Sequence, residues 1–219
     1  MAKFLLSTFI ISALVISTVN AVVGGDVSSL VTKEQFECAK THHGWEFVII
    51  RSYCSLNATD PHVVQTLANA KAAGIKYRDI YHFPCAMHDA YAQVKADLDH
   101  VGRGNFGQMW FDIEHNPSPG CEWSRDKAAN CRFVGDLISA AESLNITAAV
   151  YASKGGWAEN VGTNCTVASH LPLWYPLWDG ARNFNGWEPY GGWTKPTIHQ
   201  FNNHFARGCG IDADADYYV

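Results

Sequence analysis

The sequence predicts one α/β domain, an irregular and incomplete TIM-like (β/α) barrel, from three observations. Short apolar runs typical of strands alternate with longer segments typical of helices through the first two-thirds of the chain. This alternation predicts parallel strands joined by helical crossovers. After residue 151 the alternation stops, and short strand-like runs follow without a long helix between them. We therefore expect about five βα units followed by three short strands, with an open doubly wound sheet as the alternative.

The expected strands are short runs rich in β-branched, aromatic or other apolar residues. They cover residues 22–27, 47–53, 77–83, 110–114, 146–151, 173–178, 197–201 and 216–219. Gly155-Gly156 and Gly191-Gly192 mark loops in the second half. No internal repeat or linker divides the chain, so residues 22–219 are expected to form a single domain.

Four segments between these runs carry helix signals. Thr32 is a candidate N-cap for a helix that reaches residue 42. Asp60 precedes Pro61, as a cap residue precedes a proline in the first helical position, and Gly74 is a natural stop for that helix. Two further helices are expected around residues 91–98 and over residues 124–144, where apolar residues recur near a 3.6-residue period.

Residues 1–21 carry the features of a secretory signal peptide. Lys3 precedes an apolar stretch that runs from Phe4 to about Ile16, and Val19 and Ala21 occupy the −3 and −1 positions of a small-residue cleavage site. The apolar stretch is short for a membrane span, which needs about 20 residues. We therefore expect a secreted chain without a membrane association after cleavage.

All seven cysteines lie after the signal segment, and in an oxidising compartment most should pair. Because seven is odd, at least one is free or pairs between chains. Cys121 and Cys131 flank one short polar segment, so we expect them to close a loop. Cys54 and Cys85 each follow a strand-like run and could pair if those strands are neighbours. No cysteine or histidine spacing indicates a structural metal, and no metal or cofactor is expected.

The charge balance excludes nucleic acid as an expected partner. Loss of residues 1–21 removes only Lys3, which leaves 15 basic against 21 acidic residues, a net charge of −6. Ten histidines would make the net charge positive near pH 5. Of these, His82, His115 and His199 lie in or beside strands and could line a site, whereas His42, His43, His62, His170 and His204 are expected to be solvated.

Asp112 and Glu114 are the first candidates for chemistry. Side chains two apart in a strand point to the same face, so Trp110, Asp112 and Glu114 would face the barrel interior. Phe111 and Ile113 would then face the helices. Two buried carboxyls side by side are costly unless one keeps its proton. Glycosidases use such a pair, one carboxyl as acid and the other ionised. The alternative is a strand that ends in solvent.

More acidic residues follow other strands. Asp26 ends the first strand, and Asp212, Asp214 and Asp216 alternate along the last one. If the barrel closes, the first and last strands are neighbours, and Asp26 and one C-terminal aspartate would approach the Asp112/Glu114 pair. A calcium site is the competing interpretation of the three aspartates, but they lack the Gly and Glu of an EF-hand loop.

Aromatic residues crowd the second half, where they could stack on sugar rings or fill the core. No Gly-x-Ser-x-Gly motif suggests a serine hydrolase. We take four residues as candidate substrate-binding groups: Tyr81, Tyr151, Trp174 and Gln200.

Together these segments resemble glycoside hydrolase family 25, the Chalaropsis-type lysozymes, and especially the cysteine-containing branch in nematodes and amoebae. The similarity covers nearly all of the chain after the signal segment. It rests on five motifs: Gly-Asp26-Val-Ser-Ser, Phe47-Val-Ile-Ile-Arg51, Asp79-Ile-Tyr-His-Phe-Pro-Cys85, Trp110-Phe-Asp-Ile-Glu114, and His199-Gln-Phe with Gly210-Ile-Asp-Ala-Asp-Ala-Asp-Tyr217.

The resemblance implies an incomplete β/α barrel that cleaves the β-1,4 bond between N-acetylmuramic acid and N-acetylglucosamine. It implies that Glu114 is the proton donor, Asp112 its partner, and Asp26 the first-strand acid. The last-strand acid falls best on Asp214, with Asp212 or Asp216 left open, because Asp214-Ala-Asp216 stands where the family commonly has Asp-Leu-Asn.

The expected partner is bacterial cell-wall polysaccharide, bound by a monomer that serves digestion of bacteria or defence against them. Two alternatives stay open. One is a lectin-like protein that binds peptidoglycan or chitin on the same fold without catalysis. The other is a chitinase-type hydrolase, whose longer acidic strand motif is interrupted here by Gln108 and Trp110. Because anionic cell walls repel a protein of net charge −6, we expect activity below about pH 6, after secretion or in an acidic lysosome-like or phagosome-like compartment.

Overall fold

The computed structural model describes residues 21–205 and 207–219. The predicted signal peptide, residues 1–21, lies outside the described residues apart from Ala21, so its cleavage stays a prediction. In the part of the chain described, no helix is long and apolar enough to span a bilayer.

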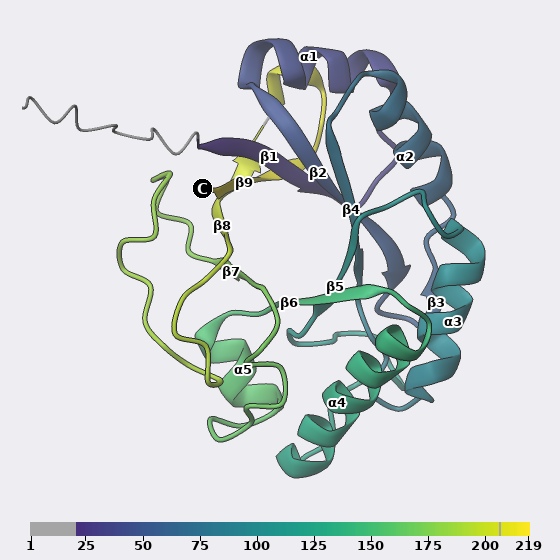
Figure 1. Ribbon diagram of the computed structural model, residues 1–219, viewed down its shortest axis with the longest axis vertical. Coiled ribbons are helices and arrows are strands. Elements are labelled where there is room, and N and C mark those ends of the chain that lie inside the picture. Colours follow the sequence, from purple (N-terminus) through teal and green to yellow (C-terminus); the bar gives the residue numbers. More distant parts are fainter. Residues whose placement is uncertain (1–20, 206) are drawn as a thin grey trace, which may run out of the picture.

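Among the described residues, nine strands form one sheet in the order β1-β9-β8-β7-β6-β5-β4-β2-β3. Pairing of β1 with β2 closes eight of them into a barrel (Figure 1), which confirms the predicted fold and excludes the open sheet. The strands are β1 (Val22–Val27), β2 (Trp45–Cys54), β3 (Ala58–Thr59), β4 (Tyr77–His82), β5 (Gln108–Asp112), β6 (Thr147–Tyr151), β7 (Leu173–Pro176), β8 (Ile198–Phe205) and β9 (Ala213–Tyr218).

The last strand departs from the parallel pattern. β9 pairs antiparallel with both β8 and β1. The connection between Phe205 and Ala213 contains only a 3₁₀ turn, Arg207–Cys209. A parallel strand would need a crossover of a dozen or more residues. The chain therefore turns back directly, and β9 closes the barrel from the opposite direction.

Five helices are described, and the first four cover one side of the barrel (Figure 1). They are α1 (Lys33–His43), α2 (Val63–Ala72), α3 (Ala90–Val101), α4 (Lys127–Ser143) and α5 (Lys154–Asn160). The other side, beside β7 and β8, carries long loops. This confirms the prediction that the last strands lack long helices between them.

The predicted helix starts are confirmed at α1 and wrong at α2. Thr32 forms a reciprocal capping box with Gln35 at the start of α1. At α2 the helix begins at Val63, because Asp60 accepts a hydrogen bond from the backbone N–H of His62 and so closes a turn before the helix (2.8 Å). The sequence also indicated a loop at Gly155-Gly156, but these glycines lie in α5, which the Ser153 hydroxyl caps.

Alternation along the strands sorts the core into two parts. Met109 and Phe111 of β5 face the helices and join the large outer core, whereas Trp110 points into the barrel with Phe47 and Ile49 of β2. All five side chains are at most 3 % exposed. The barrel interior is thus a packed layer of side chains, and Asp112 continues the inward face at the end where the parallel strands finish.

The described disulfides differ from both predicted pairs. Cys85 bonds to Cys121, Cys131 bonds to Cys165, and Cys38 bonds to Cys209. Cys121 and Cys131 lie on opposite sides of the α4 N-terminus and find partners in other loops. Cys54 is a free thiol, in agreement with the odd count of seven.

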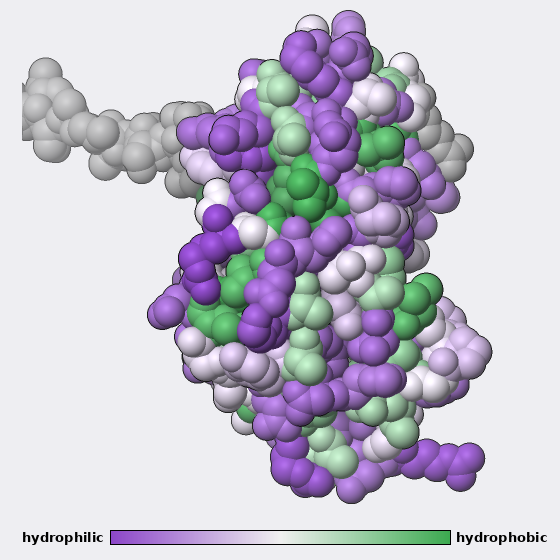
Figure 2. All heavy atoms as spheres, turned by 90° about the vertical axis from the view of Figure 1, so that its right-hand side faces the viewer, coloured by the Kyte–Doolittle hydropathy of each residue, from purple (hydrophilic) through white to green (hydrophobic). Residues whose placement is uncertain are grey.

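The outer surface over α2 and α3 is mainly hydrophilic, with apolar residues in small separate patches (Figure 2). Exposed apolar residues from this part of the chain include Leu56, Val64 and Tyr91. Isolated apolar side chains of this kind are normal on a protein surface.

Candidate active site

Four predicted catalytic carboxyls meet at the end of the barrel where the parallel strands finish. Asp26 comes from β1, Asp112 from β5 and Asp214 from β9, while Glu114 lies two residues beyond β5. Asp112 interacts electrostatically with Glu114 and Asp26, and Glu114 interacts with Asp214. Loops at this end of a β/α barrel commonly hold the active site. We call this end the mouth of the barrel.

Strand register places Asp26 beside Asp214. In the antiparallel β1–β9 pair, Asp26 lies directly opposite Asp214. Glycine makes this close approach possible, because a Cβ at Gly25 would collide with the backbone oxygen of Asp214 and with the Trp45 ring. The prediction that the first and last strands bring their acids together is therefore confirmed.

Gln200 holds Asp26 through a chain of three hydrogen bonds. The Trp178 indole and the Tyr151 hydroxyl both donate to Gln200 Oε1, each at 3.0 Å. Because an indole N–H can only donate, these contacts fix the orientation of the Gln200 amide. Gln200 Nε2 therefore donates to Asp26 Oδ2 at 2.8 Å.

Trp174 reaches a fifth carboxyl inside the barrel. Its indole Nε1 donates to Asp216 Oδ1 at 2.8 Å, and Asp216 is fully buried. The Trp174 ring is itself only 2 % exposed and packs edge-on against Trp110 and Tyr151. We conclude that Trp174 orients Asp216 and does not present a free face for a sugar.

Burial and mutual repulsion raise the pKa of every carboxyl at the mouth. Burial, Asp214 and Glu114 raise the pKa of Asp26 to about 7, against the opposing hydrogen bonds from Gln200 and Asp216. Burial raises the pKa of Asp214 to about 6, although His204 lowers it. At neutral pH these carboxyl groups therefore carry fewer negative charges than there are groups.

The pKa values of Asp112 and Glu114 are both raised by burial and by neighbouring carboxyls, but the two residues are buried to different degrees. Burial, Glu114 and Asp26 lift the pKa of Asp112 well above its usual value, and its buried Oδ1 has no hydrogen-bond partner. Glu114 is less buried, and its pKa is raised by burial and Asp214 while His115 lowers it. The weakly solvated site thus favours a retained proton on the pair, which is the state that general acid catalysis requires.

Comparison with known proteins identifies this barrel. A family model described as "Lysozyme-like protein 1" matches residues 17–201. "Probable GH family 25 lysozyme 4" of Dictyostelium discoideum is 36% identical over 98% of this chain and 97% of its own length. The chain belongs to glycoside hydrolase family 25. "Lysozyme-like protein 5" of Caenorhabditis elegans is also 36% identical, over 95% of this chain and 97% of its own length.

A solved structure shows the same family 25 fold. The lysozyme from Aspergillus fumigatus superposes with a TM-score of 0.75 and 21% identity, over 91% of this chain and 94% of that one. The predicted family, including its nematode and amoeba relatives, is thereby confirmed.

The four predicted substrate-binding residues lie together within the family 25 barrel, but at different depths. Tyr81 of β4 is partly exposed and interacts electrostatically with Asp26, Asp112 and Glu114. Tyr151 is 8 % exposed and Gln200 is 2 % exposed, so they serve the hydrogen-bond network described above. Of the four, Tyr81 offers the most accessible contact for a sugar.

Two residues of the mouth, Trp178 and Arg51, were not among the predicted site residues. Trp178 is 57 % exposed while its indole is anchored on Gln200, so an aromatic face stands beside the carboxyls. Arg51 lies opposite Tyr81 in the β2–β4 register. It donates to Asp60 through Nε (2.9 Å) and to the backbone oxygen of Ser28 through Nη2 (2.7 Å). Strand alternation places Arg51 on the inward face, whereas no local signal ties Trp178 to Gln200.

The histidine predictions need correction at two positions. His82 and His199 are fully buried on the outward faces of β4 and β8, so they do not line the mouth. His82 contacts Asp97 of α3 (2.8 Å), and His199 contacts the carbonyls of Asn183 and Leu177 (2.6 and 2.7 Å). His115 interacts electrostatically with Glu114, which agrees with the expectation that His115 could line the site. His204 is exposed, but it also interacts with Asp214.

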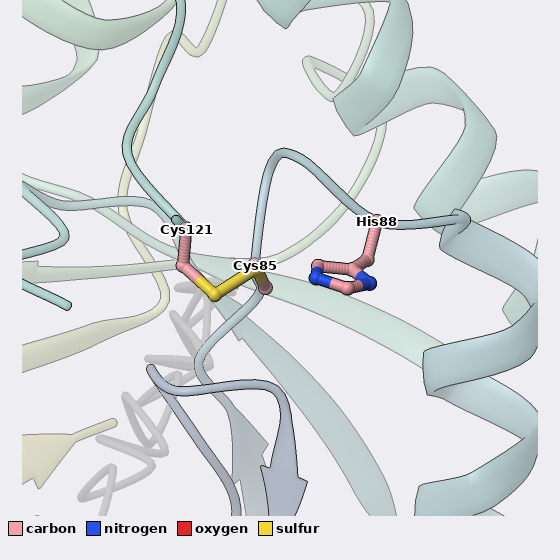
Figure 3. A group of neighbouring side chains, drawn as sticks. All are labelled: Cys85, His88 and Cys121. Carbon is pink, nitrogen blue, oxygen red and sulfur yellow. A yellow bond between two sulfur atoms is a disulfide. The ribbon is translucent and has the colours of Figure 1, made fainter. Parts of the chain in front are cut away.

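One group of potential metal ligands occurs among the described residues: Cys85, His88 and Cys121 (Figure 3). Its two cysteines are joined in a disulfide, so neither offers a thiolate. Exposed His88 beside a disulfide is not a metal site. The three C-terminal aspartates diverge in their surroundings, because Asp212 is exposed whereas Asp216 is buried against Trp174.

Proposed function

We propose that the protein is an N-acetylmuramidase that hydrolyses the β-1,4 bond between N-acetylmuramic acid and N-acetylglucosamine in bacterial peptidoglycan. Two relatives with 36% identity along nearly their whole length carry the names of lysozymes. Solved structures with this fold include muramidases, and one of them was determined with a synthetic peptidoglycan ligand. A cell-wall polysaccharide is therefore the substrate class that the family supports.

The observation that carries the proposal is the Asp112/Glu114 pair at the mouth. Both carboxyls have raised pKa values, and Asp26 and Asp214 add negative charge beside them. Glycoside hydrolysis needs a carboxyl that holds a proton for the leaving oxygen and negative charge that stabilises the oxocarbenium-like transition state. One buried acidic cluster supplies both.

Glu114 is the proton donor in this mechanism. It stands beyond the end of β5 and is more exposed than Asp112, so a glycosidic oxygen can reach it. Asp112 lies deeper and stabilises positive charge at the sugar carbon or orients the nucleophile. Burial and the charge of Asp214 keep the pKa of Glu114 raised, and Asp26 and Asp214 shape the floor of the site.

Sugar binding falls to the accessible groups of the mouth. The exposed Trp178 face can stack on the apolar face of a pyranose ring, and Tyr81 can hydrogen-bond a sugar hydroxyl beside the acids. The Gln200 amide accepts from Trp178 and Tyr151 and donates to Asp26, so its part is to connect the exposed Trp178 ring with the acids.

The acidic cluster also supports work at low pH. Raised carboxyl pKa values mean that the protons of the mouth are retained best below neutrality. We propose that the enzyme acts as a monomer after secretion or in an acidic lysosome-like or phagosome-like compartment, on bacteria that are digested or repelled. An activity optimum at pH 7–8 in low salt would contradict this setting.

The function is tested by incubating the purified protein with bacterial peptidoglycan from pH 4.5 to 7.5 and identifying the new reducing ends by mass spectrometry. We expect muramic acid reducing ends. Glu114→Gln removes the donated proton and should slow cleavage by about 100-fold or more. Glu142→Gln is the matched control, because Glu142 is exposed on α4.

Glucosamine ends would show that the wrong bond has been named, and cleavage of chitin in place of peptidoglycan would favour the chitinase-type alternative. Binding without any cleavage at any pH would favour the lectin-like alternative. A near wild-type rate for Glu114→Gln would remove Glu114 from the role of acid.

A further inference from the structure

Asp216 is a carboxyl that the mechanism above does not use. It is 0 % exposed on the inward face of β9, and the strand register places it opposite Gln200 of β8. Its Oδ1 accepts the Trp174 indole N–H. Its Oδ2 is equally buried and has no hydrogen-bond partner among the described residues. A buried carboxylate oxygen without a donor is costly.

Asp216 lies against a second carboxyl, because the side chains of Asp216 and Asp26 interact: Asp26 raises the pKa of Asp216, and Asp216 lowers that of Asp26. The orientation of the Gln200 amide is fixed by Trp178, so Asp26 Oδ2 is already an acceptor from Gln200. Two carboxylates cannot hydrogen-bond to each other. The pair is therefore stabilised when one carboxyl keeps a proton that the other accepts.

The charges around the pair act against a second negative charge. Asp214 of β9 affects both carboxyls, and Asp112 of β5 and Glu114 after β5 interact with Asp26. Tyr81 of β4 and Tyr151 of β6 face Asp26 as neutral hydroxyls, and Trp174 of β7 and Gln200 of β8 are uncharged. The nearby cation Arg51 of β2 is engaged by Asp60 and Ser28. His204 of β8 interacts with Asp214, the residue that lies opposite Asp26 in the β1–β9 pair.

Asp216 is the member that keeps the proton. It is fully buried, whereas Asp26 is partly exposed at the mouth and accepts from Gln200. Burial and Asp26 lift the pKa of Asp216 well above its usual value, while the hydrogen bond from Asp216 lowers that of Asp26. Above about pH 7, where Asp26 has ionised, it is the acceptor, held on two sides by Gln200 and Asp216.

We propose that Asp216 is a positioning residue that donates its retained proton to Asp26, and that loss of this proton sets the alkaline limit of the hydrolysis. The inference rests on the proposed function for its effect on rate. When the proton leaves, two carboxylates in contact repel each other while Trp174 and Gln200 hold each in place. Asp26 then moves away from its position beside Asp214 and Glu114, and the site loses its geometry.

Asp216→Asn is the direct test. The amide oxygen can accept from Trp174 and the amide nitrogen can donate to Asp26 at every pH, without a titrating proton. We expect the alkaline limb of the kcat profile on peptidoglycan to move up by about one pH unit or more. Asp99→Asn removes an exposed carboxyl of α3 as the matched control and should leave the limb in place.

Thermal unfolding gives a second reading that needs no substrate. Asp216 has a raised pKa in the folded protein, so wild-type stability is present at low pH and falls as the pH rises through that value. The difference in Tm between Asp216→Asn and wild type should therefore shift in favour of the variant from pH 5 to pH 8. If the wild type cleaves no peptidoglycan, the proposed function fails, and this measurement still decides where the proton is.

An unchanged alkaline limb together with a pH-independent difference in Tm would overturn the proposal. If Asp216→Asn does not fold, Trp174→Phe replaces it as the test. That change removes the indole N–H that favours the ionised form of Asp216, so the limb should again move upward. A limb that stays in place or moves down in a folded Trp174→Phe protein would equally reject the proposal.

Discussion

The barrel contains two aspartate–tryptophan pairs, one beneath the mouth and one toward the opposite end, which we call the closed end, and they differ in what the second carboxylate oxygen meets. At the closed end, Asp79 of β4 accepts the Trp110 indole N–H (3.0 Å) on one oxygen and the Gln108 backbone N–H (2.9 Å) on the other. Beneath the mouth, Asp216 accepts one indole N–H on Oδ1, while its Oδ2 has no donor and its side chain interacts with the Asp26 carboxyl.

The comparison teaches how the chain separates stability from chemistry. Burial raises the pKa of Asp79, but two N–H donors oppose the shift, so its charge is stabilised inside the protein. At the mouth, burial and neighbouring acids raise the pKa values with few donors in opposition. Asp79 therefore joins strands through its two N–H donors, whereas the carboxyls of the mouth, which have fewer donors, retain protons more readily.

The largest expected effect is at the mouth. Asp112→Asn removes a carboxyl whose Oδ1 has no partner, so folding should be little harmed, while kcat/KM on peptidoglycan should fall by about 100-fold or more. Steady-state kinetics beside Tm at pH 5 provide the measurement. If Asp112→Asn lost stability as well as activity, Asp112 would be a structural carboxyl like Asp79 at the closed end.

The closed end should respond in the opposite manner to the same chemical change. Asp79→Asn turns an NH2 group toward one of two N–H donors, so it should destabilise the protein by about 1–3 kcal/mol in urea unfolding. Asp216→Asn, which places its NH2 group against an acceptor, is the matched partner. Equal losses in the free energy of unfolding for Asp79→Asn and Asp216→Asn would contradict the difference between the two pairs.

The pH dependence of stability should follow the mouth. The pKa of Asp26 is raised to about 7 and that of Asp214 to about 6, so the stability these carboxyls allow at low pH is lost as the pH rises from about 4 to 7. We expect Tm to decline across this window and to decline less in Asp26→Asn. A Tm that rises steadily from pH 4 to 7 would show that other groups dominate.

The smallest effect is expected at an exposed ion pair. Lys154 and Glu188 are both more than half exposed, so Lys154→Ala should change the free energy of unfolding by less than about 1 kcal/mol. Added salt should reduce even that difference. A larger cost would indicate that the loop carrying Glu188 is held mainly by this contact.

Local sequence pattern predicted the parts of the site that depend on alternation. Asp112 faces inward because Phe111 faces the helices, and Asp26 meets Asp214 because the first and last strands close the barrel. The same alternation should have removed His82 and His199 from the site, since each follows or precedes an inward residue, Tyr81 or Gln200. Proximity to a strand was taken as proximity to the mouth.

Other features depend on contacts that no local pattern encodes. Each disulfide joins segments at least 34 residues apart, so spacing along the chain misled the pairing of Cys121 with Cys131. Trp178 donates a hydrogen bond to Gln200, 22 residues further along the chain, and it was not among the predicted site residues. The choice among the C-terminal aspartates needed the register of β9, which places Asp214 at the mouth and Asp216 beneath it.

The pairing of β1 with β9 has a consequence for how the enzyme is made. Asp26 emerges early in synthesis and Asp214 near the end, so the acidic cluster comes into being only when the barrel seam closes. Such distant contacts form late in folding. A growing or truncated chain that lacks β9 has an open sheet edge and an incomplete set of acids. Catalytic competence is therefore tied to the completion of the chain, and the Cys38–Cys209 disulfide locks that last step in place.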